Sequence, residues 1–176
     1  MRNRLIHQYD TVDLEDRHAG HPGAHSGSGA ARFVNGDESS VSERVGLVLV
    51  SHSRSLVQGL AELVGQVAGP AVPISAVGGA IDGSLGTDGE RVLQSLQAAA
   101  DDAGMAGAVV LMDLGSSVLA VRAALEELSE EQRARLAVVD APLVEGAVAA
   151  GVLASIGASL AEVAQAAEEA RDARKL

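Results

Sequence analysis

The sequence predicts an α/β fold, a doubly wound and mainly parallel sheet of four strands in the order 2-1-3-4, with helices on both faces. Short apolar runs rich in β-branched residues alternate with longer segments whose apolar residues recur at helical spacing. Such runs, bounded by polar or turn residues, are typical of buried parallel strands. Their alternation with helices predicts a parallel sheet, because parallel strands need crossover connections.

The clearest strand covers residues 45–50, Val-Gly-Leu-Val-Leu-Val, and ends in the polar triplet Ser51-His52-Ser53. Apolar residues at helical spacing then predict a helix within residues 55–68. His52 is therefore expected in the loop that leaves the carboxyl end of the first strand, just before a helix begins. Open α/β sheets bind their ligands at this edge.

The rest of the folded part repeats this pattern. Residues 78–88 are a long glycine-rich segment, too long for a simple connection, and are predicted to be a functional loop. The other expected elements are a strand at 73–77, a helix capped by Thr87 or Asp88 and ending near 103, a strand at 108–112, a helix to about 128, a strand at 136–139, a helix opened by Pro142 and ending near 155, and a helix capped by Ser159 and ending near 173.

Residues 1–44 differ in composition from the rest of the chain. The stretch 20–29 is built of Gly, Ser, Ala, His and Pro and has too few apolar residues to order itself. We therefore expect a flexible, low-complexity extension over 1–44 and one folded domain over 45–176. His18, His21 and His25 share no predicted strand or helix, and no metal site is expected from them.

Composition excludes several classes of function. The net charge of -11 argues against a nucleic-acid surface or an anionic membrane as partner. The sequence shows no signal peptide and no apolar run long enough for a transmembrane helix, and it has no cysteine, which together favour a cytoplasmic protein. The only aromatic residues, Tyr9 and Phe33, precede the first strand, so the domain is poorly equipped to hold a nucleotide tightly.

Polar residues follow three of the predicted strands and are expected to meet in one crevice. They combine one imidazole and one carboxylate with hydroxyl groups and backbone N–H groups, which is the inventory of an anion site that contains a histidine. The candidate residues are His52, Ser53, Gly79, Asp113, Gly115, Ser116 and Ser117.

Neither nucleotide-binding glycine motif follows the first strand. A hydrolase triad of Ser51 or Ser117 with His52 and Asp113 is conceivable, but the Gly-x-Ser-x-Gly turn is missing. A phosphohistidine relay fits better. In a relay Asp113 would accept a hydrogen bond from one ring nitrogen of His52 and leave the other free as nucleophile. The alternative for Asp113 is a helix N-cap.

Four motifs in order carry a family resemblance across residues 45–172. The sequence resembles DhaM, the phosphotransfer subunits of phosphoenolpyruvate-dependent dihydroxyacetone kinase, whose domain is similar to mannose-type IIA domains of the sugar phosphotransferase system. The motifs are Val-Leu-Val-Ser-His-Ser-Arg at 48–54, Gly-Gly at 78–79 with Gly-Thr-Asp at 86–88, Met-Asp-Leu-Gly-Ser at 112–116, and Ala-Pro-Leu-Val-Glu-Gly-Ala at 141–147.

The resemblance implies that His52 takes a phosphoryl group from the phosphohistidine of HPr and passes it to ADP on the nucleotide-binding subunit of the kinase. ATP formed there phosphorylates dihydroxyacetone on a third subunit, so no tightly bound cofactor is expected on this chain. It also implies a homodimer and, from the length, the single-domain form. Two alternatives stay open: a IIA component of a mannose-family sugar transporter, and a non-catalytic interaction module on the same fold.

Overall fold

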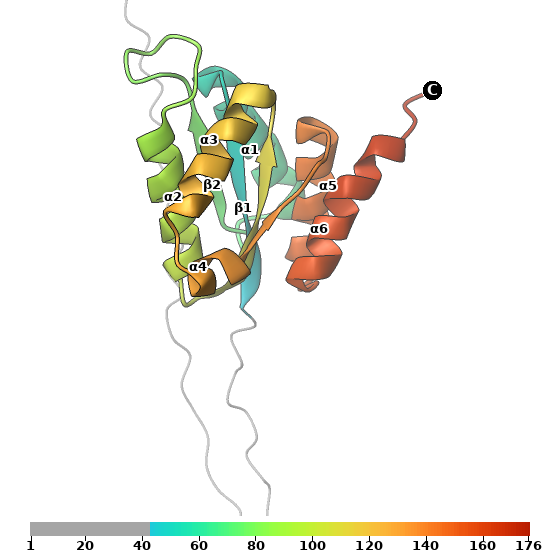
Figure 1. Cartoon of the computed structure of the whole chain (residues 1–176). Coiled ribbons are helices and arrows are strands. Elements are labelled where there is room, and N and C mark those ends of the chain that lie inside the picture. Colours follow the sequence, from blue (N-terminus) through green and yellow to red (C-terminus); the bar gives the residue numbers. More distant parts are fainter. Residues whose placement is uncertain (1–42) are drawn as a thin grey trace, which may run out of the picture. The chain divides into compact units, whose positions relative to one another are not determined.

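Four parallel strands form one sheet within residues 43–176, the part of the chain that the computed structural model describes (Figure 1). Their order, β2-β1-β3-β4, is the predicted one, so the predicted fold class is confirmed. The predictions for His18, His21 and His25 lie outside the described residues. The strands are β1 Arg44–Ser51, β2 Ile74–Gly78, β3 Met105–Met112 and β4 Leu136–Val138.

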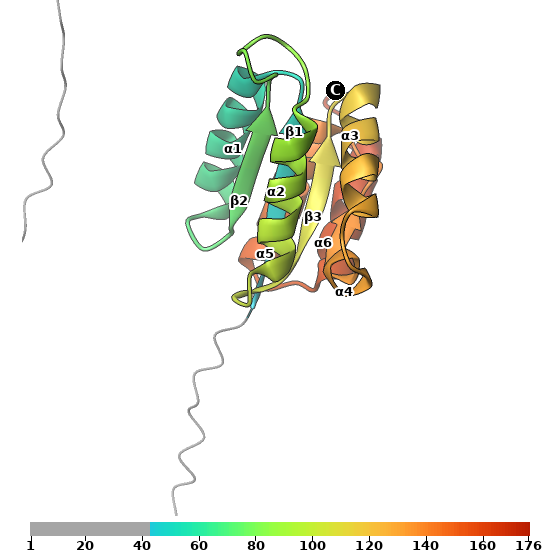
Figure 2. The same ribbon diagram turned by 60° about the vertical axis from the view of Figure 1, so that its left-hand side comes forward.

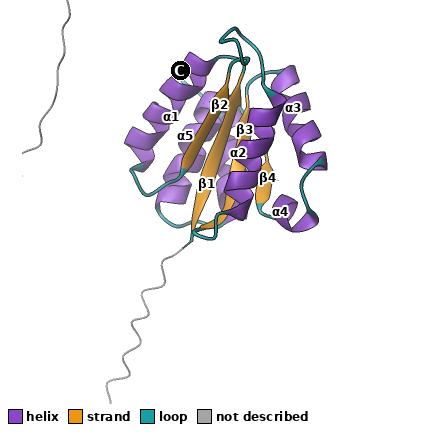
Figure 3. Cartoon of the chain, turned by 90° about the vertical axis from the view of Figure 1, so that its left-hand side faces the viewer, coloured by secondary structure: helices purple, strands orange, loops and turns teal. Residues whose placement is uncertain are grey.

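Helices cover both faces of the sheet (Figure 3). Helices α1, α5 and α6 pack on one face, and α2 and α3 pack on the other. Among the described residues no helix is both long and apolar enough to cross a bilayer. The helices are α1 Arg54–Ala68, α2 Gly89–Asp101, α3 Gly115–Glu126, α4 Glu130–Ala134, α5 Leu143–Ser155 and α6 Leu160–Glu169, followed by a 3-10 helix at Ala170–Asp172.

The central strand β1 divides the core into two layers. Successive side chains of a strand point to opposite faces. Accordingly Leu47 and Leu49 pack under α1 and α5, whereas Val48 and Val50 pack under α2 and α3. Both faces of β1 are buried, which explains why the sequence of this strand is continuously apolar.

Two boundaries differ from the sequence prediction by more than two residues, and one helix was not expected. Strand β3 begins at Met105, three residues earlier than expected, because Gly107 interrupts the apolar run without ending the strand. The short helix α4 was not expected, although its capping box between Ser129 and Gln132 is a recognisable signal. The last α-helix ends at Glu169 and is continued by the 3-10 turn.

Candidate functional site

The carboxyl ends of β1 and β3 bring His52 and Asp113 together. The two strands pair in parallel with Val50 opposite Met112, and the N–H of Asp113 donates to the carbonyl oxygen of Val50 at 3.2 Å. The residues that follow each strand therefore lie side by side at the same edge. His52 and Asp113 are both partly buried, with 22% and 15% of their side chains exposed.

The Asp113 carboxylate accepts four hydrogen bonds. Oδ2 receives the hydroxyl of Ser51 and the backbone N–H of His52, both at 2.8 Å. Oδ1 receives Nδ1–H of His52 at 2.8 Å and the N–H of Leu114 at 2.7 Å. Each carboxylate oxygen thus accepts two hydrogen bonds, which fix the carboxylate and hold the imidazole in one orientation.

These contacts set the charge of Asp113. Burial alone would raise the pKa of its carboxyl group, but the hydrogen bonds from the His52 backbone, Ser51, the His52 ring and Leu114 together lower that pKa well below its usual range. Asp113 is therefore ionised at neutral pH and can only accept. Nδ1 of His52 must then carry a proton, which in the neutral ring leaves a lone pair on Nε2.

Nε2 faces the start of helix α3. The Ser116 side chain lies within hydrogen-bond distance of it, so the hydroxyl donates to the free lone pair. Helix α3 begins after Leu114, whose side chain cannot cap it. The N–H groups of Gly115 and Ser116 thus stand in a first turn without intrahelical acceptors, next to the imidazole.

Ser117 does not join this group. It is fully buried, and its hydroxyl donates to the carbonyl oxygen of Leu114 at 2.6 Å. Consecutive residues of a helix point about 100° apart, so α3 turns Ser116 toward His52 and Ser117 into the protein. The expectation that Ser117 binds phosphate therefore conflicts with its burial. The N-cap alternative for Asp113 is also wrong, because the N-cap of α3 is Leu114.

Ser53 follows His52 in the chain, and Gly79 follows β2, which lies on the side of β1 away from β3. Ser53 caps α1, where its Oγ accepts from the N–H of Leu56 at 3.3 Å and keeps its own proton free to donate. Gly79 has φ +77°, and a Cβ there would come within 3.3 Å of Cβ of Arg54 at the start of α1. A side chain at position 79 would therefore be both strained and crowded.

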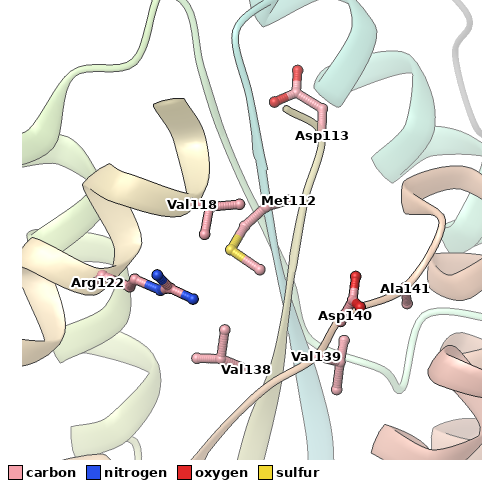
Figure 4. A pocket seen from close by; sticks show the side chains of 8 residues that line it. All are labelled: Met112, Asp113, Val118, Arg122, Val138, Val139, Asp140 and Ala141. Atoms are coloured by element: carbon pink, nitrogen blue, oxygen red, sulfur yellow. The ribbon is translucent and has the colours of Figure 1, made fainter. Parts of the chain in front are cut away.

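A pocket of about 370 Å³ lies beside the site (Figure 4). Of the candidate site residues, only Asp113 lines this pocket. On the far side of the pocket, Arg122 extends from α3 toward Val138. The imidazole of His52 is not part of its lining. Within residues 43–176 no three His, Cys, Asp or Glu side chains are grouped as a metal would require.

The role of Ser51 was not foreseen from the sequence, which suggested it only as a nucleophile. It is fully buried and bonded to Asp113, and its Oγ also accepts the N–H of Ser53 at 3.1 Å. Only the register of the folded sheet places it, because the pairing of Val50 with Met112 leaves Ser51 opposite Asp113.

Comparisons with known proteins give the family. Residues 46–164 match the model of the PTS system fructose IIA component. A phosphoryl donor subunit DhaM of the PEP-dependent dihydroxyacetone kinase 2 of Listeria innocua is 33% identical over 121 residues, which are 69% of this chain and 94% of the relative. The phosphotransferase subunit DhaM of the PTS-dependent dihydroxyacetone kinase of Lactococcus lactis is 32% identical over 124 residues. The match covers 70% of this chain and 94% of that relative.

Longer relatives match over one part only. The DhaM subunit of Escherichia coli is 37% identical over 134 residues, but the match covers 28% of its length. Among solved structures, the crystal structure of the protein EF1359, of unknown function, has a TM-score of 0.64 and 34% identity, covering 72% of this chain and 94% of that one. The resemblance drawn from the four motifs is confirmed: the chain belongs to the PTS fructose IIA component family and, within it, to the DhaM phosphoryl donor subunits.

Proposed function

We propose that this protein is a phosphohistidine carrier of a dihydroxyacetone kinase, and that Nε2 of His52 is the atom that holds the phosphoryl group. The observation that carries this proposal is the bond from Nδ1–H to the ionised Asp113, because it leaves Nε2 as the only ring nitrogen with a free lone pair. The DhaM relatives are phosphoryl donor subunits of such kinases.

In the first step Nε2 attacks the phosphorus of a phosphohistidine on HPr. The bond between phosphorus and the donor nitrogen breaks, its electron pair stays on that nitrogen, and a bond to Nε2 forms. Nδ1 keeps its proton, so the ring of His52 becomes cationic while it holds the phosphoryl group. The adjacent carboxylate of Asp113 stabilises this charge, as the carboxylate does in other histidine sites.

Neutral donors would meet the phosphoryl oxygens. Ser116 gives up its bond to Nε2 and donates its hydroxyl, and the N–H groups of Gly115 and Ser116 point from the start of α3. Ser53 supplies a second hydroxyl. A carrier gains from donors without full charge, since it must release the group again.

In the second step an oxygen of the β-phosphate of ADP attacks the same phosphorus. The bond to Nε2 breaks, and the ring returns to its neutral form with the proton still on Nδ1. ADP sits on the nucleotide-binding kinase subunit, and dihydroxyacetone on another, so this chain holds no cofactor tightly. The carrier acts in the cytoplasm as a homodimer; its oligomeric state is measurable by sedimentation.

Reconstitution tests the proposal. Incubation with phosphoenolpyruvate, enzyme I and HPr should add one acid-labile phosphoryl group to the wild type, detected by intact mass, and none to His52→Ala. Labelling of the alanine variant would show that another residue is the acceptor. No labelling of the wild type would favour a non-catalytic interaction module.

A sugar-transporter role is the second candidate, because the matching family model describes a PTS fructose IIA component. Addition of the two kinase subunits and dihydroxyacetone separates the two functions. The carrier of a dihydroxyacetone kinase produces triose phosphate in this mixture. A protein that accepts the phosphoryl group from HPr but yields no triose phosphate belongs to a transporter instead.

A further inference from the structure

The pocket of about 370 Å³ beside the candidate site combines one cation with an apolar lining. The cation is Arg122 of α3, and the apolar side chains are those of Met112, Val118, Val138 and Val139. Figure 4 shows the guanidinium group reaching from α3 toward Val138, with Val118 and Met112 beside it. We call this cavity the Arg122 pocket.

The charge of Arg122 is not neutralised within the described part of the chain. Its side chain is exposed, and it forms no ion pair with any acid of residues 43–176. Glu126 lies four residues further along α3, at the spacing where opposite charges pair on a helix. The guanidinium group turns toward the pocket instead. One wall of the Arg122 pocket is therefore positively charged.

The two carboxylates in the lining do not balance this charge. Asp113 already accepts four hydrogen bonds, which fill the lone-pair sites of a carboxylate. Asp140 lies 3.3 Å from Arg171, which is not part of the lining. An occupant with one negative charge would balance Arg122. A second negative charge would find no cation in the lining and would be repelled by the ionised Asp113.

We propose that the Arg122 pocket binds a small aliphatic monocarboxylate. Its carboxylate accepts hydrogen bonds from the guanidinium group of Arg122, and its hydrocarbon body packs on Met112, Val118 and Val138. Guanidinium and carboxylate groups are both planar and form two parallel hydrogen bonds. The inference goes beyond phosphoryl transfer, because the imidazole of His52 does not line this pocket.

Size and lining favour a small molecule over a side chain of another protein. Small-molecule sites are typically cavities of about 300–1,000 Å³ with a mainly apolar lining and a few polar groups, and this pocket of about 370 Å³ falls in that range. An acidic side chain would match Arg122 but has too little hydrocarbon to cover the apolar lining. An apolar side chain would cover the lining but leave the charge of Arg122 unbalanced.

Titration of the full-length, unphosphorylated protein with isocaproate, a branched aliphatic acid, tests the proposal. Two-dimensional 15N–1H NMR spectra should show saturable shifts at the amides of Met112, Val118 and Val139, with a dissociation constant of about 0.1–10 mM. Isocaproamide has the same body without the charge, and acetate has the charge without the body. Each should bind at least about 10-fold more weakly than isocaproate.

The substitution Arg122→Gln should weaken the binding of isocaproate by about 10- to 100-fold, because hydrogen bonds between charged groups are lost. Arg133→Gln is the matched control, since Arg133 is an exposed arginine of α4. Figure 2 shows α4 at the end of the sheet opposite to the arrowheads of the strands. This variant removes the same charge far from the pocket and should bind isocaproate like the wild type. Circular dichroism checks that both variants are folded.

Four results would overturn the monocarboxylate site. Absence of saturable shifts in the wild type would show that no such acid binds, and equal affinity for isocaproamide or acetate would show that charge and body are not read together. Unchanged affinity in Arg122→Gln would place the acid elsewhere. Equal losses in Arg122→Gln and Arg133→Gln would assign the effect to the net charge of -11 instead of the pocket. None of these measurements depends on labelling by phospho-HPr, so they are independent of the proposed function.

Discussion

The hydrogen bond between His52 and Asp113 is the feature on which the chemistry depends. It selects the tautomer of the ring, and it supplies the negative charge that balances the phosphorylated imidazole. The other three bonds to Asp113 keep its carboxylate ionised and in place. Asp113 is thus the centre of a small hydrogen-bond network.

The substitution Asp113→Asn should keep the geometry of the site but no longer select the tautomer of the His52 ring. An amide can present its NH2 group to Nδ1, which then holds the lone pair while Nε2 carries the proton. We expect phosphorylation of His52 by phospho-HPr to slow by about 100- to 10,000-fold, the range found when a proton is held on the wrong site.

Asp140→Asn is the control for that variant, since Asp140 follows the neighbouring strand β4 and its side chain is 98% exposed. Stopped-flow or quench measurement of the phosphorylation rate compares the two. Similar rates for Asp113→Asn and the wild type would show that Asp113 does not orient the ring.

The lowered pKa of Asp113 also makes the stability of the protein depend on pH. Its folded pKa lies below the unfolded value of 3.8, so the unfolded chain binds more protons in this range and stability rises with pH. The contribution is complete well above pH 4 and is lost as pH falls toward the folded pKa. Urea unfolding at pH 6 and pH 3 measures this effect. The difference in free energy of unfolding between the wild type and Asp113→Asn should be smaller at pH 3 than at pH 6.

At the scale of elements, helix α5 packs closely because it contains glycine. A Cβ at Gly151 would come within 2.7 Å of Cγ1 of Val64, which is fully buried on α1. Valine in a helix has essentially one side-chain rotamer, so Val64 cannot turn away. The spacing between α1 and α5 therefore depends on this one missing side chain.

Gly151→Ala should destabilise the protein, with an overpacking cost of about 1–3 kcal/mol that exceeds the gain in helix propensity. Gly59→Ala on α1 is the matched control: nothing lies within 4 Å of its added Cβ, so we expect stabilisation by about 0.5–1 kcal/mol. Urea unfolding followed by circular dichroism measures both, and an opposite order of the two would contradict the packing described.

The sequence predicted the elements better than it predicted the site. Strands β1 and β2 and helices α1, α2 and α5 were expected within two residues of their observed ends, because apolar runs, caps and turn residues are local signals. Ser117 and Ser51 could not be placed in the same way. Their surroundings depend on where α3 begins and on the register between β1 and β3, which are properties of the folded sheet.

At the scale of the whole molecule, we propose that residues 45–176 form the carrier domain and that the preceding extension has no part in phosphoryl transfer. The family match begins at residue 46. A chain that starts at residue 43 should therefore accept the phosphoryl group from phospho-HPr at the rate of the full-length protein. A marked loss of rate in the shorter chain would assign a functional role to the extension.

The position of the phosphoryl group on the ring tests the central claim most directly. Two-dimensional NMR of the protein labelled with 15N-histidine, before and after phosphorylation by phospho-HPr, resolves the two ring nitrogens of His52 by their shifts and couplings. The structure predicts phosphorus on Nε2 and a retained proton on Nδ1, held by Asp113. Phosphorus on Nδ1, or on any other side chain, would contradict the account.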